Sequence, residues 1–181
     1  MKLELKKFKP PYFIHSDIIY AHNILVSYGK FDEKKNICEN HFDFLKDELG
    51  EKNLIFPSFN YQFGKSLKFD LTKDISEVGS LSEWVRTRSG FYRSHSPFFS
   101  ILTKDKFIEF KKNQYLYGKD SFFEKIFNMD GTFLFYGVDF SIFTALHYLE
   151  TTLGPVPYRY DKIFKGKIIE NDNSKNCEAV L

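Results

Sequence analysis

The sequence contains only two cysteines, Cys38 and Cys177, which lie far apart and without metal-ligand spacing. This scarcity excludes a disulfide-rich scaffold and a cysteine-based zinc motif, so we expect two free thiols in a reducing cytoplasm. No uncharged run is long enough to cross a bilayer, and the charged start of the chain does not resemble a signal peptide. These absences predict a cytoplasmic protein with no metal and no membrane partner.

Strong net charge is also absent, because the formal balance is only +2 and the lysines are scattered among acids. The sequence therefore gives no reason to expect nucleic acid as a partner. A length of 181 residues predicts a single domain, residues 1–181, with enough chain to form its own core. The 22 phenylalanines and 11 tyrosines are numerous. They favour core packing over stacking on sugar rings, although aromatic residues serve both purposes.

One segment predicts a strand, a tight loop and a helix in succession. Residues 132–136 are apolar and aromatic, as in a buried strand, and Gly137 interrupts them. Ser141 is the expected N-cap of the following helix, which ends at Gly154 and Pro155. Proteins of the α/β class bind ligands beyond the carboxyl ends of such strands, so this segment is the expected location of a site.

His147 and Glu150 lie three residues apart and share one face of that helix. An imidazole beside a carboxylate can accept a proton at neutral pH, while the carboxylate fixes its tautomer. A surface pair with no chemical role has the same spacing. The helix is otherwise apolar, which predicts burial and favours the chemical interpretation. Its apolar residues are Phe143, Ala145, Leu146 and Leu149.

The rest of the chain alternates strand-like and helix-like segments, which predicts a three-layer α/β/α sandwich with a central mixed sheet. Strands are expected at residues 12–14, 53–57, 98–103 and 165–170, and helices at 32–49, 80–88, 104–112 and 121–128. Asp32 is the expected cap of the clearest helix, in which His41 is predicted to be a surface residue. Residues 58–73 are expected to form a long irregular loop, and residues 171–181 are expected to fray.

A polar segment runs from Arg93 to Ser100 and includes Ser94. Small hydroxyls, backbone amides and a guanidinium together suit a phosphate or pyrophosphate group. A plain polar turn has the same composition, so the sequence alone leaves both interpretations open.

Taken in order, these segments resemble the aminoglycoside 3-N-acetyltransferase family. The resemblance extends over residues 10–167, and eight blocks in the right order are specific although each alone is weak. The blocks are residues 13–16; 56–59 with Tyr61; 78–81 with Glu83; Gly90 with Arg93, Ser94, Pro97 and Ser100; Gly118 with Ser121; 137–138; Thr144 with His147 and Glu150; and 156–159.

The resemblance implies transfer of acetyl from acetyl-CoA to an amine on a sugar-like ring, without a metal or a covalent enzyme intermediate. In this family pattern His147 is the general base, and Glu150 orients it or holds the cationic amine of the acceptor. The implied positions that contact the cosubstrate are Ser16, Arg93, Ser94, Ser100 and Thr144. Those expected to contact the acceptor are Asp17, Tyr61, Asp139 and Arg159.

The resemblance thus predicts a cytoplasmic acyltransferase that acetylates an aminoglycoside, as in antibiotic resistance, or another amino sugar. The family pattern continues beyond the last residue of this sequence. We therefore expect either a piece of a longer protein or a short form whose acceptor is not an antibiotic. Two alternatives are a non-catalytic member that binds CoA or a partner, and a sugar O-acetyltransferase that uses the same base.

Overall fold

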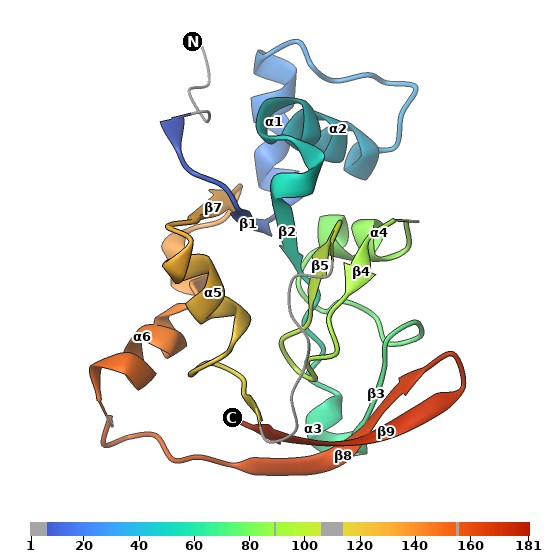
Figure 1. Ribbon diagram of the computed structural model, residues 1–181. Helices are drawn as coiled ribbons and strands as arrows, with labels where there is room; N and C mark the ends of the chain where they lie inside the picture. The colour runs from blue at the N-terminus through green and yellow to red at the C-terminus, as the bar shows by residue number, and fades with distance from the viewer. Residues whose placement is uncertain (1–6, 89, 106–113, 155) are drawn as a thin grey trace.

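The computed structural model describes residues 7–88, 90–105, 114–154 and 156–181, and a five-stranded mixed sheet lies at its centre (Figure 1). The strand order is β4 (Tyr92–Arg93), β5 (Ile101–Thr103), β2 (Leu54–Pro57), β1 (Tyr12–Ser16), β7 (Thr132–Tyr136). β1 runs parallel to both β2 and β7, whereas β5 is antiparallel to β2 and to β4. The predicted central mixed sheet is therefore confirmed.

Helices cover both faces of this sheet, which gives the predicted three layers. Tyr12 and Ile14 of β1 point to one face and pack with α1 (Ile18–Ser27), α2 (Ile37–Leu49) and α4 (Ser80–Arg86). Phe13 points to the opposite face, toward α5 (Phe122–Asn128) and α6 (Leu146–Leu153). This alternation follows from the two-residue period of a strand whose two faces are both buried.

A second sheet has the order β3 (Lys68–Asp70), β8 (Ile163–Glu170), β9 (Asn173–Val180), β6 (Gln114–Tyr115). Its β8–β9 hairpin lies along the lower edge of Figure 1. The expectation that residues 171–181 fray is wrong, because β9 pairs with β8 along its whole length. Cys177 and Ala179 are buried on one side of β9, and the polar residues 173–176 that precede them concealed this alternation in the sequence.

Several further expectations need correction. Residues 58–73 contain a short helix, α3 (Phe63–Ser66), as well as β3. α2 begins at Ile37 rather than near Asp32, because the Asn36 side chain accepts a hydrogen bond from the Cys38 nitrogen at 2.8 Å and caps the helix. α1 was not predicted, and the side chain of Asp17 caps it. The helix expected at 104–112 lies largely outside the described residues.

His41 is the clearest error, because this predicted surface residue is 0% exposed in α2. Its Nδ1 lies 2.7 Å from the hydroxyl of Tyr136, at the end of β7. Both cysteines are buried free thiols, as expected. Within the described part of the chain, no helix is long and apolar enough to cross a membrane.

Candidate active site

The three parallel strands of the central sheet bring several of the predicted site residues to one edge. All three strands end at this edge. Ser16 is the last residue of β1, and Ser58 and Gly137 directly follow β2 and β7. Ser16 is 9% exposed, and its hydroxyl has no hydrogen-bond partner among the described residues. This edge of a parallel arrangement is where α/β proteins bind ligands.

Two acidic residues expected to contact the acceptor lie near this edge and cap helices. Asp17 accepts a hydrogen bond from the Ile19 nitrogen at 3.0 Å, at the start of α1. Asp139 accepts one from the Ser141 nitrogen at 2.7 Å, at the start of the 3-10 helix η3 (Phe140–Ile142). Each carboxylate therefore has a local structural role, whatever contact it makes with a ligand.

The segment that carries His147 differs from the predicted continuous helix. Asp139, not Ser141, supplies the side-chain cap, and η3 and a turn at residues 144–145 precede α6. Within the described residues of α6, none is buried, and Leu146 and Leu153 are 46% and 88% exposed. The prediction that this helix is largely buried is therefore wrong. Within α6, Tyr148 packs against Phe127, and just before the helix Phe143 and the fully buried Ala145 contact the core.

His147 and Glu150 lie side by side near the start of α6, as their spacing predicted. The Nδ1 atom of His147 is 3.1 Å from Oε2 of Glu150. The side chains are 30% and 15% exposed, so both are accessible to a ligand without being fully solvated. The ring of His147 also lies against the ring of Tyr117, with 4.7 Å between the centroids.

Two residues of the segment after α6 complete this cluster. The hydroxyl of Tyr158 donates a hydrogen bond to Oε1 of Glu150 at 2.8 Å. Arg159 approaches with two nitrogens: Nε lies 2.8 Å from Oε2 of Glu150, and Nη2 lies 2.6 Å from Nδ1 of His147. The neighbouring imidazole of His147, the hydroxyl of Tyr158 and the charge of Arg159 lower the pKa of Glu150. Glu150 is therefore a carboxylate at neutral pH.

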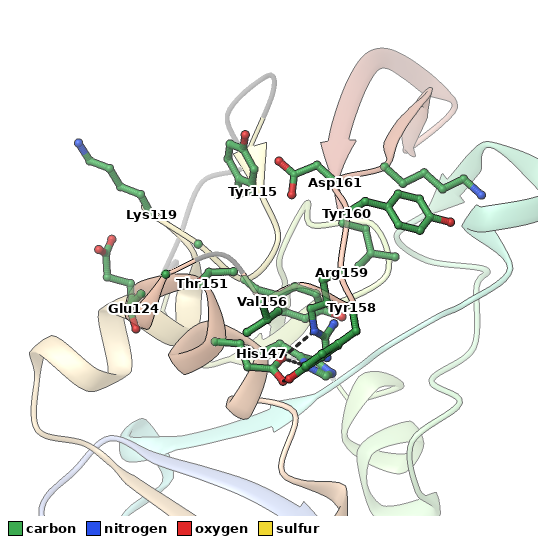
Figure 2. Close-up of a pocket in the computed structure, with 17 residues that line it drawn as sticks. Tyr115, Lys119, Glu124, His147, Thr151, Val156, Tyr158, Arg159, Tyr160 and Asp161 are labelled. Carbon is green, nitrogen blue, oxygen red and sulfur yellow. Dashed lines mark hydrogen bonds and ion pairs between the residues drawn. The ribbon is translucent and has the colours of Figure 1, made fainter.

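This cluster forms part of a pocket of about 870 Å³. Figure 2 shows His147, Tyr158 and Arg159 gathered at one end, with Tyr115, Lys119 and Asp161 around the other. Among the described residues of the lining, the charges are balanced, three of each sign: Lys119, Arg159, Lys162, Glu124, Glu150 and Asp161. Four tyrosines also contribute to it: Tyr115, Tyr117, Tyr158 and Tyr160.

Tyr117 is a member of the site that the sequence analysis missed. Its ring contacts His147 on one side and Phe99 on the other, with centroids 4.7 and 4.8 Å away. Phe99 in turn lies 6.2 Å from the ring of Tyr61, one of the predicted acceptor residues. A continuous aromatic path thus links Tyr61 to His147. The sequence signal was only the neighbouring Gly118, which marked a loop without indicating the tyrosine.

The predicted phosphate loop occupies a different part of the same strand edge. Arg93 donates to the Ser100 hydroxyl at 3.0 Å and to the carbonyl oxygens of Ser58, at 2.9 Å, and of Asp74. Burial lowers the pKa of Arg93 to about 10, so its guanidinium remains charged. The Ser94 hydroxyl accepts from a main-chain nitrogen, and Ser100 donates to the Ser58 carbonyl. These three side chains therefore stabilise the loop itself.

Thr144 lies just before α6, where its hydroxyl donates to the Ile142 carbonyl at 3.3 Å. The structure thus groups His147, Glu150 and Arg159 directly and brings Tyr61 close through Tyr117 and Phe99. Arg93, Ser94 and Ser100 form a separate group. The assignment of cosubstrate and acceptor contacts to any of these residues stays a prediction.

The fold and this cluster define an α/β protein with a histidine–carboxylate pair in a pocket. The sequence model of one protein family, described as aminoglycoside 3-N-acetyltransferase, matches residues 38–180. The chain therefore belongs to the aminoglycoside 3-N-acetyltransferase family, which is a family of N-acyltransferases. A comparison with curated proteins finds no match.

Solved structures show the same fold at low sequence identity. AAC-IIIb in a binary complex with CoASH has a TM-score of 0.72 and 16% identity, over 96% of this chain and 69% of that one. YokD from Bacillus subtilis has a TM-score of 0.67 and 15% identity, over 93% and 74%. A histidine-to-alanine mutant of AAC(3)-IVa in complex with a gentamicin has a TM-score of 0.68 and 18% identity, over 96% and 64%. This chain thus spans about two thirds of the length of such proteins.

Proposed function

We propose that residues 1–181 form one cytoplasmic acetyltransferase domain that transfers acetyl from acetyl-CoA to the amine of an amino sugar. The observation that carries this proposal is the contact between His147 and Glu150, 3.1 Å apart in a pocket, in a member of an N-acetyltransferase family. A general base held by a carboxylate is what acetylation of an amine requires.

The chemical argument begins with the acceptor. An amine with a pKa of about 8–10 is mostly protonated at neutral pH, so it must lose a proton before it can attack. The Nδ1 atom of His147 faces Glu150, while Nε2 forms no hydrogen bond with any described residue. Nε2 is therefore the nitrogen we assign as the base. Glu150 would keep the proton of the ring on Nδ1 and stabilise the imidazolium that forms.

Acetyl-CoA supplies the acetyl group as a thioester, and CoASH is bound in the related AAC-IIIb structure. In this chain, Ser16 fits a role at the thioester because its buried hydroxyl has no partner among the described residues. Thr144, close to His147, is the second candidate. Arg93, Ser94 and Ser100 would support the cosubstrate by fixing their loop, because their side chains already bond to groups within this region.

The acceptor we favour carries a single amino group. Aminoglycosides are polycations, and AAC(3)-IVa has been solved with a gentamicin and with apramycin. Of the described residues that line the pocket, as many are cationic as acidic, and Arg159 already pairs with Glu150. A polycation would therefore gain little net attraction here. The tyrosines of the lining offer flat apolar surfaces on which a sugar ring can stack.

Mass spectrometry of reaction products tests this function directly. The protein is incubated with acetyl-CoA and a panel of mono-amino sugars, nucleotide-linked amino sugars, aminoglycosides and amine-free sugars. We expect N-acetylation of a mono-amino sugar, with a larger kcat/KM than for any aminoglycoside. A larger value for an aminoglycoside would reverse the acceptor ranking. Acetylation of hydroxyls alone would favour an O-acetyltransferase, and no acetylated product would contradict the enzyme assignment.

A further inference from the structure

The two contacts made by Nδ1 of His147 are chemically incompatible with each other. Nη2 of Arg159, at 2.6 Å, belongs to a guanidinium that is always protonated and can only donate. Oε2 of Glu150, at 3.1 Å, belongs to a carboxylate that can only accept. Nδ1 must lack a hydrogen to satisfy Arg159, and it must carry one to satisfy Glu150. Only one of these hydrogen bonds can exist at a time.

The geometry favours the contact with Arg159. It is the shorter of the two, and a hydrogen on Nδ1 would be forced against an N–H of the guanidinium. In this arrangement both carboxylate oxygens of Glu150 have partners other than His147. Tyr158 donates to Oε1, and Nε of Arg159 lies 2.8 Å from Oε2. A neutral ring that accepts at Nδ1 carries its hydrogen on Nε2. That nitrogen then cannot take a proton from an acceptor amine.

We propose that Arg159 is a positioning residue that sets the tautomer of His147 in the free protein. While Nη2 donates to Nδ1, the ring has its hydrogen on Nε2 and is not a base. When Arg159 withdraws, Nε2 releases its proton to solvent and Nδ1 takes one up from solvent. The Nδ1–H group then donates a hydrogen bond to the carboxylate of Glu150, and Nε2 is free to accept a proton from the acceptor. This inference rests on the proposed role of His147 as the base.

The location of Arg159 is compatible with such a withdrawal. Its side chain is 40% exposed, and the residues on either side, Tyr158 and Tyr160, are 70% and 83% exposed. Between α6 and β8, the described residues 156–162 belong to no helix or strand. A segment with few buried contacts can move at a small free-energy cost. A phosphate or carboxylate on a ligand in the pocket would compete for the guanidinium through bidentate hydrogen bonds.

Nitrogen-15 NMR of histidine-labelled protein tests the tautomer without any substrate. At a pH of about 8, above the ordinary histidine pKa of about 6.5, neutral rings are observed and the two tautomers have distinct ring-nitrogen shifts. The His147→Gln variant identifies the signals of His147. We expect the hydrogen of His147 on Nε2 in the wild type and on Nδ1 in Arg159→Met. Lys162→Met removes a cation from the same pocket lining and serves as the matched control, with the wild-type tautomer.

The wild-type spectrum alone overturns the proposal if His147 carries its hydrogen on Nδ1 or is charged at this pH. An unchanged tautomer in Arg159→Met, with the signals of the other four histidines in place, also overturns it. Kinetics then test the release step: kcat of Arg159→Met is expected to exceed the wild-type value, because Nε2 is then a base without any withdrawal of Arg159, while KM reports any lost acceptor contact. A kcat at or below the wild-type value would contradict release. If the wild type acetylates nothing, the proposed function fails, but the spectra still decide the tautomer.

Discussion

The buried histidine His41 makes the stability of this protein sensitive to mild acid. It is 0% exposed in α2, and its Nε2 atom has no hydrogen-bond partner among the described residues. Burial, and then the nearby His22, lower its pKa from 6.5 to about 4. The unfolded chain therefore binds a proton at a higher pH than the folded protein does. The contribution of His41 to stability is complete above pH 6.5 and is lost as the pH falls toward 4.

The magnitude follows from these two pKa values. Each pKa unit corresponds to about 1.4 kcal/mol. Keeping His41 neutral in the folded protein at pH 5 therefore lowers the free energy of unfolding by about 2 kcal/mol relative to pH 7.5. His41→Gln removes the titration and keeps an amide that can hydrogen-bond to the Tyr136 hydroxyl. Lowering the pH from 7.5 to 5 should therefore reduce the free energy of unfolding of the wild type by about 2 kcal/mol more than that of the variant.

Urea unfolding of both proteins at pH 7.5 and pH 5.0 measures this shift, because the change in midpoint at constant m gives the free energy. His95→Gln is the matched control: His95 is a partly exposed residue whose Nε2 lies 2.9 Å from Glu170. This variant gives the effect of losing a surface histidine–carboxylate pair, and such pairs typically contribute less than about 1 kcal/mol. A shift for His41→Gln no larger than that of His95→Gln would refute the reasoning.

Three other predictions concern the loop, the strand edge and the site. Arg93→Met should lower the free energy of unfolding by about 2–4 kcal/mol, because buried carbonyls lose a charged donor; unchanged urea stability would contradict this. Gly137→Ala should lower Tm more than Gly29→Ala: both have positive φ, but a Cβ at Gly137 would lie 2.7 Å from a main-chain nitrogen, whereas Gly29 has open space. Glu150→Gln should lower kcat less than His147→Gln, since the base remains; an equal loss would mean that the charge is essential.

The elements of the fold that the sequence predicted well are those with a strong local signal. Residues 132–136 form β7 as predicted, since an uncharged, largely aromatic run before a glycine suits a strand. Its predicted burial is wrong for four of the five residues, because β7 is the edge strand of the sheet and only Tyr136 is buried. The end of α2 at Gly50 was likewise predicted, because glycine adopts the positive φ of 83° found there. β9 was missed because its inward residues are small, and only its pairing with β8 identifies it.

In the site too, the sequence predicted the contact between residues close in the chain and missed the contacts that depend on tertiary structure. The contact of His147 with Glu150 follows from helical spacing, so the sequence could predict it. Tyr117 reaches His147 from a loop 30 positions earlier, and no periodicity or cap relates the two. The composition of the segment around Arg93 left a phosphate site and a plain polar turn equally open, and only the family resemblance implied a cosubstrate contact. The actual bonds of Arg93 depend on the approach of the Ser58 and Asp74 carbonyls, which only the folded chain brings together.

Turnover of His147→Gln, with the acceptor that the product screen identifies, tests the central claim most directly. Glutamine keeps much of the size and polarity of histidine but cannot take a proton at neutral pH. With unfolding and CoA affinity like those of the wild type, kcat should fall by roughly 10²–10⁴-fold. A folded variant that turns over like the wild type would contradict the account.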